Sequence, residues 1–183
     1  RLLPVRRCGD HGSMRALVKP EYNSVDAVRG LTFQMEPGEL LGFIGPNGAG
    51  KSTTIKMLTG ILHPTAGAAK VLGYVPWKER QKLAFHIGTV FGQRPQLWYH
   101  LPAIDTFTLF GKIFEMDERD TQLRIGQLAE AFEIRDLLET PVRKLSLGQR
   151  MRCDVAASLL HRPRLILLDE PSIGLDVVAK QHI

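Results

Sequence analysis

The feature that most limits how this chain can fold is a glycine-rich segment, Gly45–Ser52, which reads Gly-Pro-Asn-Gly-Ala-Gly-Lys-Ser. It follows an apolar run, Leu40–Ile44, that is typical of a strand covered on both faces. A helical pattern over Ser52–Thr59 comes next and ends at Gly60. Glycines let successive backbone N–H groups turn toward an anion, and the helix presents its positive end to the same place. The segment therefore predicts a phosphate-binding loop between a strand and a helix.

The residues of this loop have separate expected roles. Lys51 is expected to pair with the β- and γ-phosphates of a nucleotide, and the Ser52 hydroxyl to bind Mg²⁺. The other nucleotide-binding residues are expected to surround the phosphates, and they are Gly45, Pro46, Asn47, Gly48, Ala49, Gly50 and Thr53. An accidental match of a glycine-rich turn is the alternative, and the flanking strand and helix patterns argue against it.

Two acids follow the second strong apolar run. Leu165–Leu168 predicts a buried strand, and Asp169 and Glu170 come directly after it. Ligands of open α/β sheets bind at the carboxyl ends of the strands, where an aspartate is expected beside Mg²⁺. The pair could also be an ordinary solvated strand end. The phosphate loop favours the functional interpretation.

The remaining periodicity indicates an α/β protein with a mostly parallel sheet. Weaker strand patterns occupy Val28–Met35 and Ile87–Val90, and the first alternates as a half-buried strand does. Helical patterns are predicted over Asp105–Glu115, Asp120–Phe132 and Ser146–Leu160. Residues 1–14 show no periodic pattern and are interpreted as a loose basic arm.

Composition excludes several classes of protein. Among 183 residues, 44% are hydrophobic and 23% charged, which is typical of a globular chain and not of a disordered one. Cys8 and Cys153 lie far apart, so neither a disulfide framework nor a zinc site is indicated. No apolar run is long enough for a membrane helix. The net charge of +5 would suit a polyanion, but a solvated basic arm explains it equally well.

Four motifs, taken in order, resemble those of the ATP-binding cassette (ABC) family. They are Gly45–Ser52, Gln93, Leu145–Gln149 and Leu165–Asp176. Leu147 departs from the family pattern, which has glycine there. The resemblance covers residues 15–183 and implies a P-loop NTPase fold with an N-terminal antiparallel β portion and an inserted helical subdomain at about residues 95–160. Ile183 follows Glu170 by only 13 residues, so we expect the sheet to be incomplete at the C-terminus.

The resemblance also implies roles for single residues. Glu170 is the expected general base, Asp169 and Gln93 join Ser52 around Mg²⁺, and Tyr22 stacks on adenine. Residues expected at the ATP of a second cassette are Ser146, Gly148 and Gln149, and Asp176 belongs to the loop that crosses the dimer interface. Ser146 is in addition the predicted N-cap of its own helix.

The function that the resemblance implies is ATP binding and hydrolysis that powers transmembrane transport, most resembling export of drugs or other small molecules. Its expected partners are a transmembrane permease subunit and a second cassette in a homo- or heterodimer, at the cytoplasmic face of the cell membrane. No direct contact with nucleic acid is expected. The aromatic segment Gln96–Pro102 is interpreted as the docking surface for the permease. The alternatives are a soluble ABC ATPase acting on ribosomes or DNA, and a truncated nucleotide-binding module without turnover.

Overall fold

The computed structural model describes residues 26–91 and 96–170. The chain forms two compact units, Arg1–Gly50 and Lys51–Ile183. The helices and strands assigned in the described residues all belong to the second unit, and in chain order they are α1 (Lys51–Leu58), α2 (Arg80–Ala84), β1 (Ile87–Phe91), α3 (Ala103–Ile113), α4 (Glu118–Ala131), η2 (Arg135–Leu137), η3 (Val142–Lys144), α5 (Leu147–Ser158) and β2 (Leu165–Asp169).

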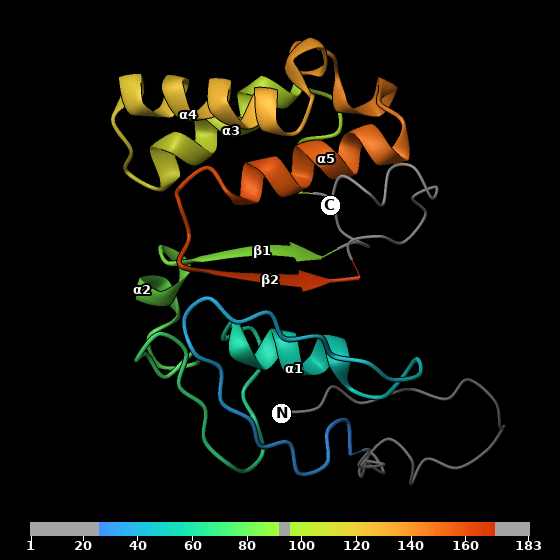
Figure 1. Cartoon of the computed structure of the whole chain (residues 1–183), viewed down its shortest axis with the longest axis vertical. Helices are drawn as coiled ribbons and strands as arrows, with labels where there is room; N and C mark the ends of the chain where they lie inside the picture. Colours follow the sequence, from blue (N-terminus) through green and yellow to red (C-terminus); the bar gives the residue numbers. More distant parts are fainter. Residues whose placement is uncertain (1–25, 92–95, 171–183) are drawn as a thin grey trace, which may run out of the picture. The chain divides into compact units, whose positions relative to one another are not determined.

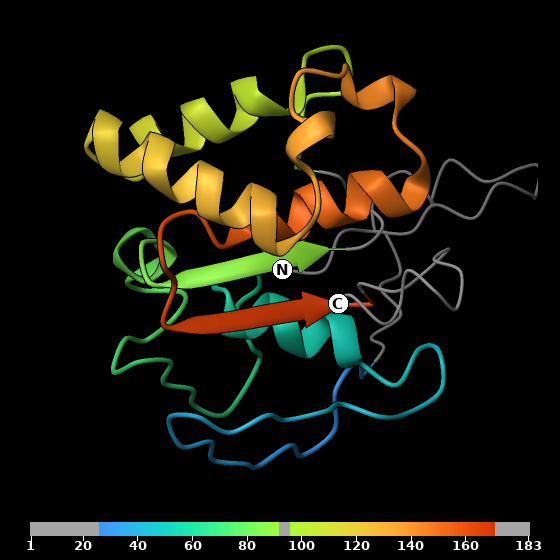
Figure 2. The ribbon, with the colours of Figure 1, turned by 45° about the horizontal axis from the view of Figure 1, so that its top comes forward.

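A parallel sheet lies at the centre of the second unit. β1 pairs with β2 in the register Ile87 to Leu165 and Phe91 to Asp169. Helix α1 lies against one face of the sheet, and α5 lies against the other, as Figures 1 and 2 show. Helices α3 and α4 pack together on the far side of α5. The unit is therefore layered, with the sheet between α1 and α5, and with α3 and α4 outside α5.

Helix α5 contacts the sheet on one side and the layer of α3 and α4 on the other. Its Met151 and Val155 pack with Val90 of β1. Its opposite side belongs to a larger buried cluster that also includes residues of α3, α4 and the turns that follow α4. The members of this cluster include Leu97, Phe107, Ile125, Leu128, Ile134, Val142, Cys153, Ala156 and Leu160. Burying apolar surface on both sides fixes α5 between the two layers.

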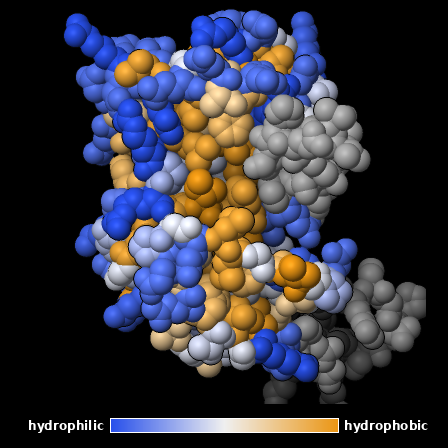
Figure 3. All heavy atoms as spheres, viewed as in Figure 1, coloured by the Kyte–Doolittle hydropathy of each residue, from blue (hydrophilic) through white to orange (hydrophobic). Residues whose placement is uncertain are grey.

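The buried strand predicted over Leu165–Leu168 forms, but only part of it is buried. Leu167 is 9% exposed, whereas Ile166 and Leu168 are 46% and 37% exposed. The register places Ile166 beside Gly88, where a Cβ would collide with the Ser158 carbonyl of α5. Since α5 contacts β1, the neighbouring apolar residues of β2 on that face remain partly open. Figure 3 shows one face of the molecule, on which hydrophobic residues lie among hydrophilic ones.

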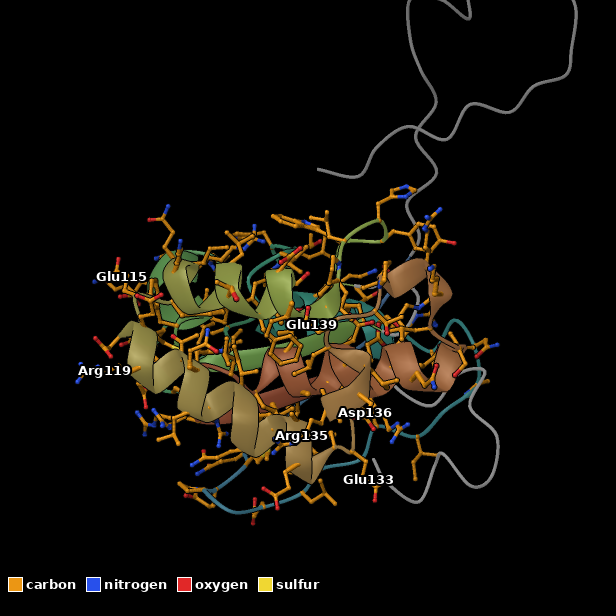
Figure 4. All side chains as sticks on the ribbon, turned by 90° about the horizontal axis from the view of Figure 1, so that it is seen from above. Glu115, Arg119, Glu133, Arg135, Asp136 and Glu139 are labelled. Carbon is orange, nitrogen blue, oxygen red and sulfur yellow. The ribbon has the colours of Figure 1, made fainter. Side chains whose placement is uncertain are left out.

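Both helices of the outer layer have well-defined ends. The Asp117 side chain caps α4 by accepting hydrogen bonds from the N–H groups of Arg119 and Asp120. Glu115 and Glu133 follow α3 and α4 in the left-handed region, at φ +54° and +52° (labelled in Figure 4). Their N–H groups, and those of the next residues, bond back to the last helical turn. This is the Schellman arrangement, in which glycine is the usual residue.

Most of the predicted elements of the second unit are found within two residues of their expected bounds. The helix predicted at Ser52–Thr59 ends with Gly60 at φ +73° as expected. The short α2 and the 3₁₀ turns η2 and η3 were not predicted, because five or three residues are too few for a helical period to show.

The first unit differs from the sequence-based expectation. In residues 26–50 no strand is assigned, so the strands predicted at Val28–Met35 and Leu40–Ile44, and the antiparallel β portion there, are not found in the described residues. A turn forms at Pro37-Gly38, and the rings of Phe33 and Phe43 meet edge to face at 5.4 Å. A strand needs a paired backbone as well as an apolar pattern, and Leu40 and Ile44 are fully exposed.

The closest approach between α3 and α4 gives a test of this packing. A Cβ at Gly111 would lie 2.5 Å from Cγ2 and 2.7 Å from Oγ1 of Thr121. Thr121 is buried, and its hydroxyl donates to the Asp117 carbonyl, so it cannot turn away without losing that bond. We expect Gly111→Ala to lower the free energy of unfolding by about 1–3 kcal/mol, measured by urea titration.

The matched control is Gly126→Ala in α4, where a Cβ would meet nothing within 4 Å. Because alanine favours helix more than glycine does, this variant should gain up to about 1 kcal/mol. A Gly111→Ala variant as stable as Gly126→Ala would contradict the described contact between the two helices.

Candidate functional site

The two predicted Mg²⁺ ligands that the structure describes lie in contact. Ser52 is the second residue of α1, and Asp169 is the last residue of β2. The Ser52 Oγ donates a hydrogen bond to Asp169 Oδ1 at 2.8 Å, and the pair is partly buried. The crossover from α1 to β2 thus brings together two side chains that are 117 positions apart in the sequence.

This pair has the chemistry that Mg²⁺ prefers. A hydroxyl and a carboxylate are hard oxygen ligands, and Mg²⁺ is commonly held by one or two carboxylates together with the phosphates of a substrate. Among the described residues, no group of three or more His, Cys, Asp or Glu side chains could hold a metal ion. One hydroxyl and one carboxylate suit an ion that arrives with the phosphates of a nucleotide.

Glu170 directly follows Asp169 and has a backbone conformation that is uncommon for a residue other than glycine. Its φ is +52°, in the left-handed region that residues other than glycine adopt at a cost of about 1–2 kcal/mol. The chain therefore turns sharply where the two acids leave the sheet. Backbone strain of this kind is concentrated at functional sites. Glu170 is half-buried, so its carboxyl is within reach of solvent.

Residues Gly45–Gly50 of the predicted phosphate loop belong to the first unit. Gly48 and Gly50 have φ of +86° and +88°, where side chains are strained. The Ala49 N–H donates to the Pro46 carbonyl at 3.2 Å, which closes a turn inside the loop. A Cβ at Gly50 would collide with the Ala27 carbonyl. Only glycine fits at Gly50, for both its conformation and its surroundings.

The predicted N-cap of α5 is confirmed. Ser146 Oγ accepts a hydrogen bond from the Gln149 N–H at 3.2 Å, and Gln149 Oε1 accepts one from the Ser146 N–H at 2.9 Å. This reciprocal capping box fixes the first turn of α5. Ser146 and Leu147 are exposed, so the positive end of the helix is open to a ligand.

The aromatic segment Gln96–Pro102 presents side chains from a fixed backbone. The Trp98 N–H donates to Thr106 Oγ1 at 3.2 Å, and the Arg143 N–H donates to the Tyr99 carbonyl at 2.9 Å. Nevertheless, the Trp98 and Tyr99 side chains are 47% and 51% exposed. Large aromatic groups on a firmly held backbone are typical of a binding surface.

Sequence reasoning missed Asp154 of α5. It is 4% exposed, and its Oδ1 accepts hydrogen bonds from the N–H groups of Gln96 at 2.9 Å and Leu97 at 3.2 Å. Burial raises the pKa of this carboxyl to about 6, although the two N–H groups and Arg150 lower it. The available signal was an acid one residue before Val155, inside a helix predicted to be buried.

Three of the predicted site residues lie outside the described residues, namely Tyr22, Gln93 and Asp176, and so does the arm at residues 1–14. In the ranges 26–91 and 96–170, no helix has the length and apolar character needed to cross a membrane.

Comparison with known proteins places the fold and motifs in one family. The family model described as ABC transporter matches residues 28–173. The chain is 33% identical over 166 residues to the linearmycin resistance ATP-binding protein of Bacillus subtilis, covering 91% of this chain and 53% of that protein. It is 36% identical over 155 residues to the daunorubicin resistance ATP-binding protein of Streptomyces coeruleorubidus, covering 85% and 49%. The chain thus spans about half the length of these curated relatives.

A solved structure of similar fold supports the same family assignment. The fold is similar to that of cbiO1 from Clostridium perfringens, part of the ABC transporter complex cbiONQ, with a TM-score of 0.74 and 29% identity over 85% of this chain and 63% of that one. This likeness confirms the predicted α/β fold class. The ordered motifs, the parallel sheet and these similarities together establish that the chain belongs to the ABC transporter family.

Proposed function

We propose that this chain binds and hydrolyses ATP, and that hydrolysis drives the export of small molecules through a separate transmembrane permease subunit. The observation that carries the proposal is the hydrogen bond between Ser52 and Asp169. It joins the helix that follows the glycine loop to the acid expected beside Mg²⁺. Export is supported by the names of the two relatives, both of which are resistance ATP-binding proteins.

The proposed chemistry assigns one task to each residue. Lys51 and the backbone of the glycine loop would hold the phosphates, and Ser52, Asp169 and Gln93 would hold Mg²⁺, which would neutralise charge on the β- and γ-phosphates. Glu170 accepts a proton from the water molecule whose oxygen attacks the γ-phosphorus. The bond from that phosphorus to the β–γ bridging oxygen breaks, and its electron pair leaves with ADP. Tyr22 stacks on the adenine.

A second cassette completes the proposed site. The open N-terminus of α5 carries Ser146, Gly148 and Gln149, and backbone N–H groups at a helix N-terminus bind anions. We assign this end of α5 to the γ-phosphate of ATP held by the partner cassette, with Asp176 in the loop between the two. ATP would then hold the two cassettes together, as a homodimer or a heterodimer.

The exposed pair Trp98 and Tyr99 supports a protein partner that docks on this segment. We assign that partner as the permease, which would hold the chain at the inner face of the cell membrane. A soluble ATPase acting on ribosomes or DNA would not need this contact, and a nucleotide-binding module without turnover would bind ATP but leave it intact. Co-purification and hydrolysis distinguish these alternatives.

The proposed mechanism predicts how two substitutions change the hydrolysis and the binding of ATP. Glu170→Gln removes the proposed base but keeps the shape of the side chain, so we expect ATP hydrolysis to fall about 100-fold or more with binding retained. Lys51→Ala should instead weaken ATP binding by at least about tenfold, because it removes a charge-assisted contact to phosphate. Steady-state phosphate release and equilibrium ATP binding are the measurements. Equal hydrolysis by Glu170→Gln and the parent chain would remove Glu170 from the mechanism.

The proposed docking segment predicts how a substitution at Trp98 changes binding to the permease. Trp98→Ala should lower co-purification with the permease subunit by about tenfold or more, as truncation of a central aromatic contact does at other interfaces. ATP affinity should stay within about twofold. The matched control is Trp77→Ala, since the chain contains two tryptophans and Trp77 packs against His63, at a different place in the unit. Unchanged recruitment of Trp98→Ala would argue against docking at this segment.

A further inference from the structure

We infer that Asp154 is a positioning residue, whose carboxylate fixes the segment Gln96–Tyr99 to α5 so that the segment and the helix move as one body. The inference deepens the proposed function, because that segment carries the proposed permease contact and α5 begins at the proposed contact with the partner's ATP. Asp154 is buried, accepts hydrogen bonds from the segment, and lies on the helix that Ser146 caps.

The contact fixes the orientation of the segment as well as its distance from α5. A single atom, Asp154 Oδ1, accepts the N–H groups of two consecutive residues, Gln96 at 2.9 Å and Leu97 at 3.2 Å. Two neighbouring N–H groups that point at one oxygen fix the orientation of the peptide plane between them. Leu97 is 3% exposed, so water does not compete there. Bonds to an ionised acceptor are about twice as strong as neutral ones.

The same segment is held on its other side by the sheet. The side-chain amide of Gln96 donates to the Thr89 carbonyl in β1. Val90, the next residue of β1, packs on Met151 and Val155 of α5. The segment, β1 and α5 therefore contact one another pairwise, and Asp154 supplies the polar contact between the segment and the helix.

The placement of Asp154 is unfavourable for stability alone. The residue lies in the middle of α5, between the buried residues Cys153 and Val155, away from the helix N-terminus where an acid is stabilised. Burial in this position raises the pKa of its carboxyl, which shows that the ionised form is destabilised. An apolar residue would avoid this cost, but it would leave the N–H groups of Gln96 and Leu97 without their acceptor. A costly buried acid that binds a loop backbone is better explained by the position it gives to that loop.

The two ends of this connection have different proposed partners. Ser146 lies eight positions before Asp154, about two helical turns away, and faces the ATP of the second cassette in the proposed function. Trp98 directly follows the two bonded residues and faces the permease. A displacement of α5 by the partner's ATP would thus be carried to Trp98 through Asp154.

The experiment compares Asp154→Leu with Asp154→Asn in the full chain. Leucine removes the acceptor, whereas asparagine keeps an oxygen that can receive both N–H groups. We expect hydrogen exchange of a peptide covering residues 96–99 to rise at least tenfold in Asp154→Leu and to stay within threefold of the parent in Asp154→Asn. Exchange in α4 should be unchanged in Asp154→Leu, whereas a loss of fold would raise it.

A second measurement uses the chain reconstituted with its permease and ATP. Asp154→Leu should lose at least tenfold in permease-stimulated kcat with its KM for ATP within twofold, and Asp154→Asn should recover most of that loss. Equal exchange at residues 96–99 in all three proteins would overturn the inference, as would full stimulation of Asp154→Leu. If the permease failed to stimulate the parent chain while the exchange difference was observed, the proposed function would fail and the positioning role of Asp154 would stand.

Discussion

Parallel pairing of β1 with β2 determines where the functional groups of the second unit lie. Parallel strands run in the same direction, so their carboxyl ends lie at the same edge of the sheet. A crossover connection joins the end of one strand to the start of the next. The register pairs Phe91 with Asp169, so the chain leaves β1 and β2 at neighbouring positions. Helix α1 packs on β2 with its first turn at this edge, which allows Ser52 to reach Asp169. A slip of the register would shift the end of β1 relative to the acids that follow β2.

The second constraint is the close contact of α5 with β1. A Cβ at Gly88 would lie 2.6 Å from the Ser158 carbonyl, so only a residue without a side chain lets the helix lie this near the strand. The approach allows Met151 and Val155 to bury Val90, and it brings the middle of α5 to the segment after β1. Asp154 can bind that segment only because the helix is held this close.

Sequence predicted the parts of this arrangement that depend on local pattern. Helical periodicity located α3, α4 and α5, apolar runs located β1 and β2, and the spacing of the glycine loop pointed to Ser52. The strand predicted at Leu40–Ile44 was not found, because an apolar run reports a preference for burial and not the presence of a paired neighbour.

The left-handed backbone at Glu115 and Glu133 and the contact of Asp154 could not be predicted from the sequence. At the first two, the surroundings impose a left-handed backbone on residues with no preference for it. Asp154 meets Gln96, 58 positions away, through a backbone N–H that every residue except proline has, so no side-chain type in the segment marks the contact.

Ser146 and Ser52 each take part in a structural bond and keep the atoms that the proposed function would require of them. Ser146 uses an oxygen lone pair to accept from the Gln149 N–H, and its own O–H remains available to donate to a phosphate oxygen. Ser52 does the reverse, since its O–H donates to Asp169 and its lone pairs remain available for a metal ion. The bond to Asp169 thus orients the Ser52 oxygen before any ion binds. A serine can hold its own structural element in place and still bind the ligand, because a hydroxyl both donates and accepts.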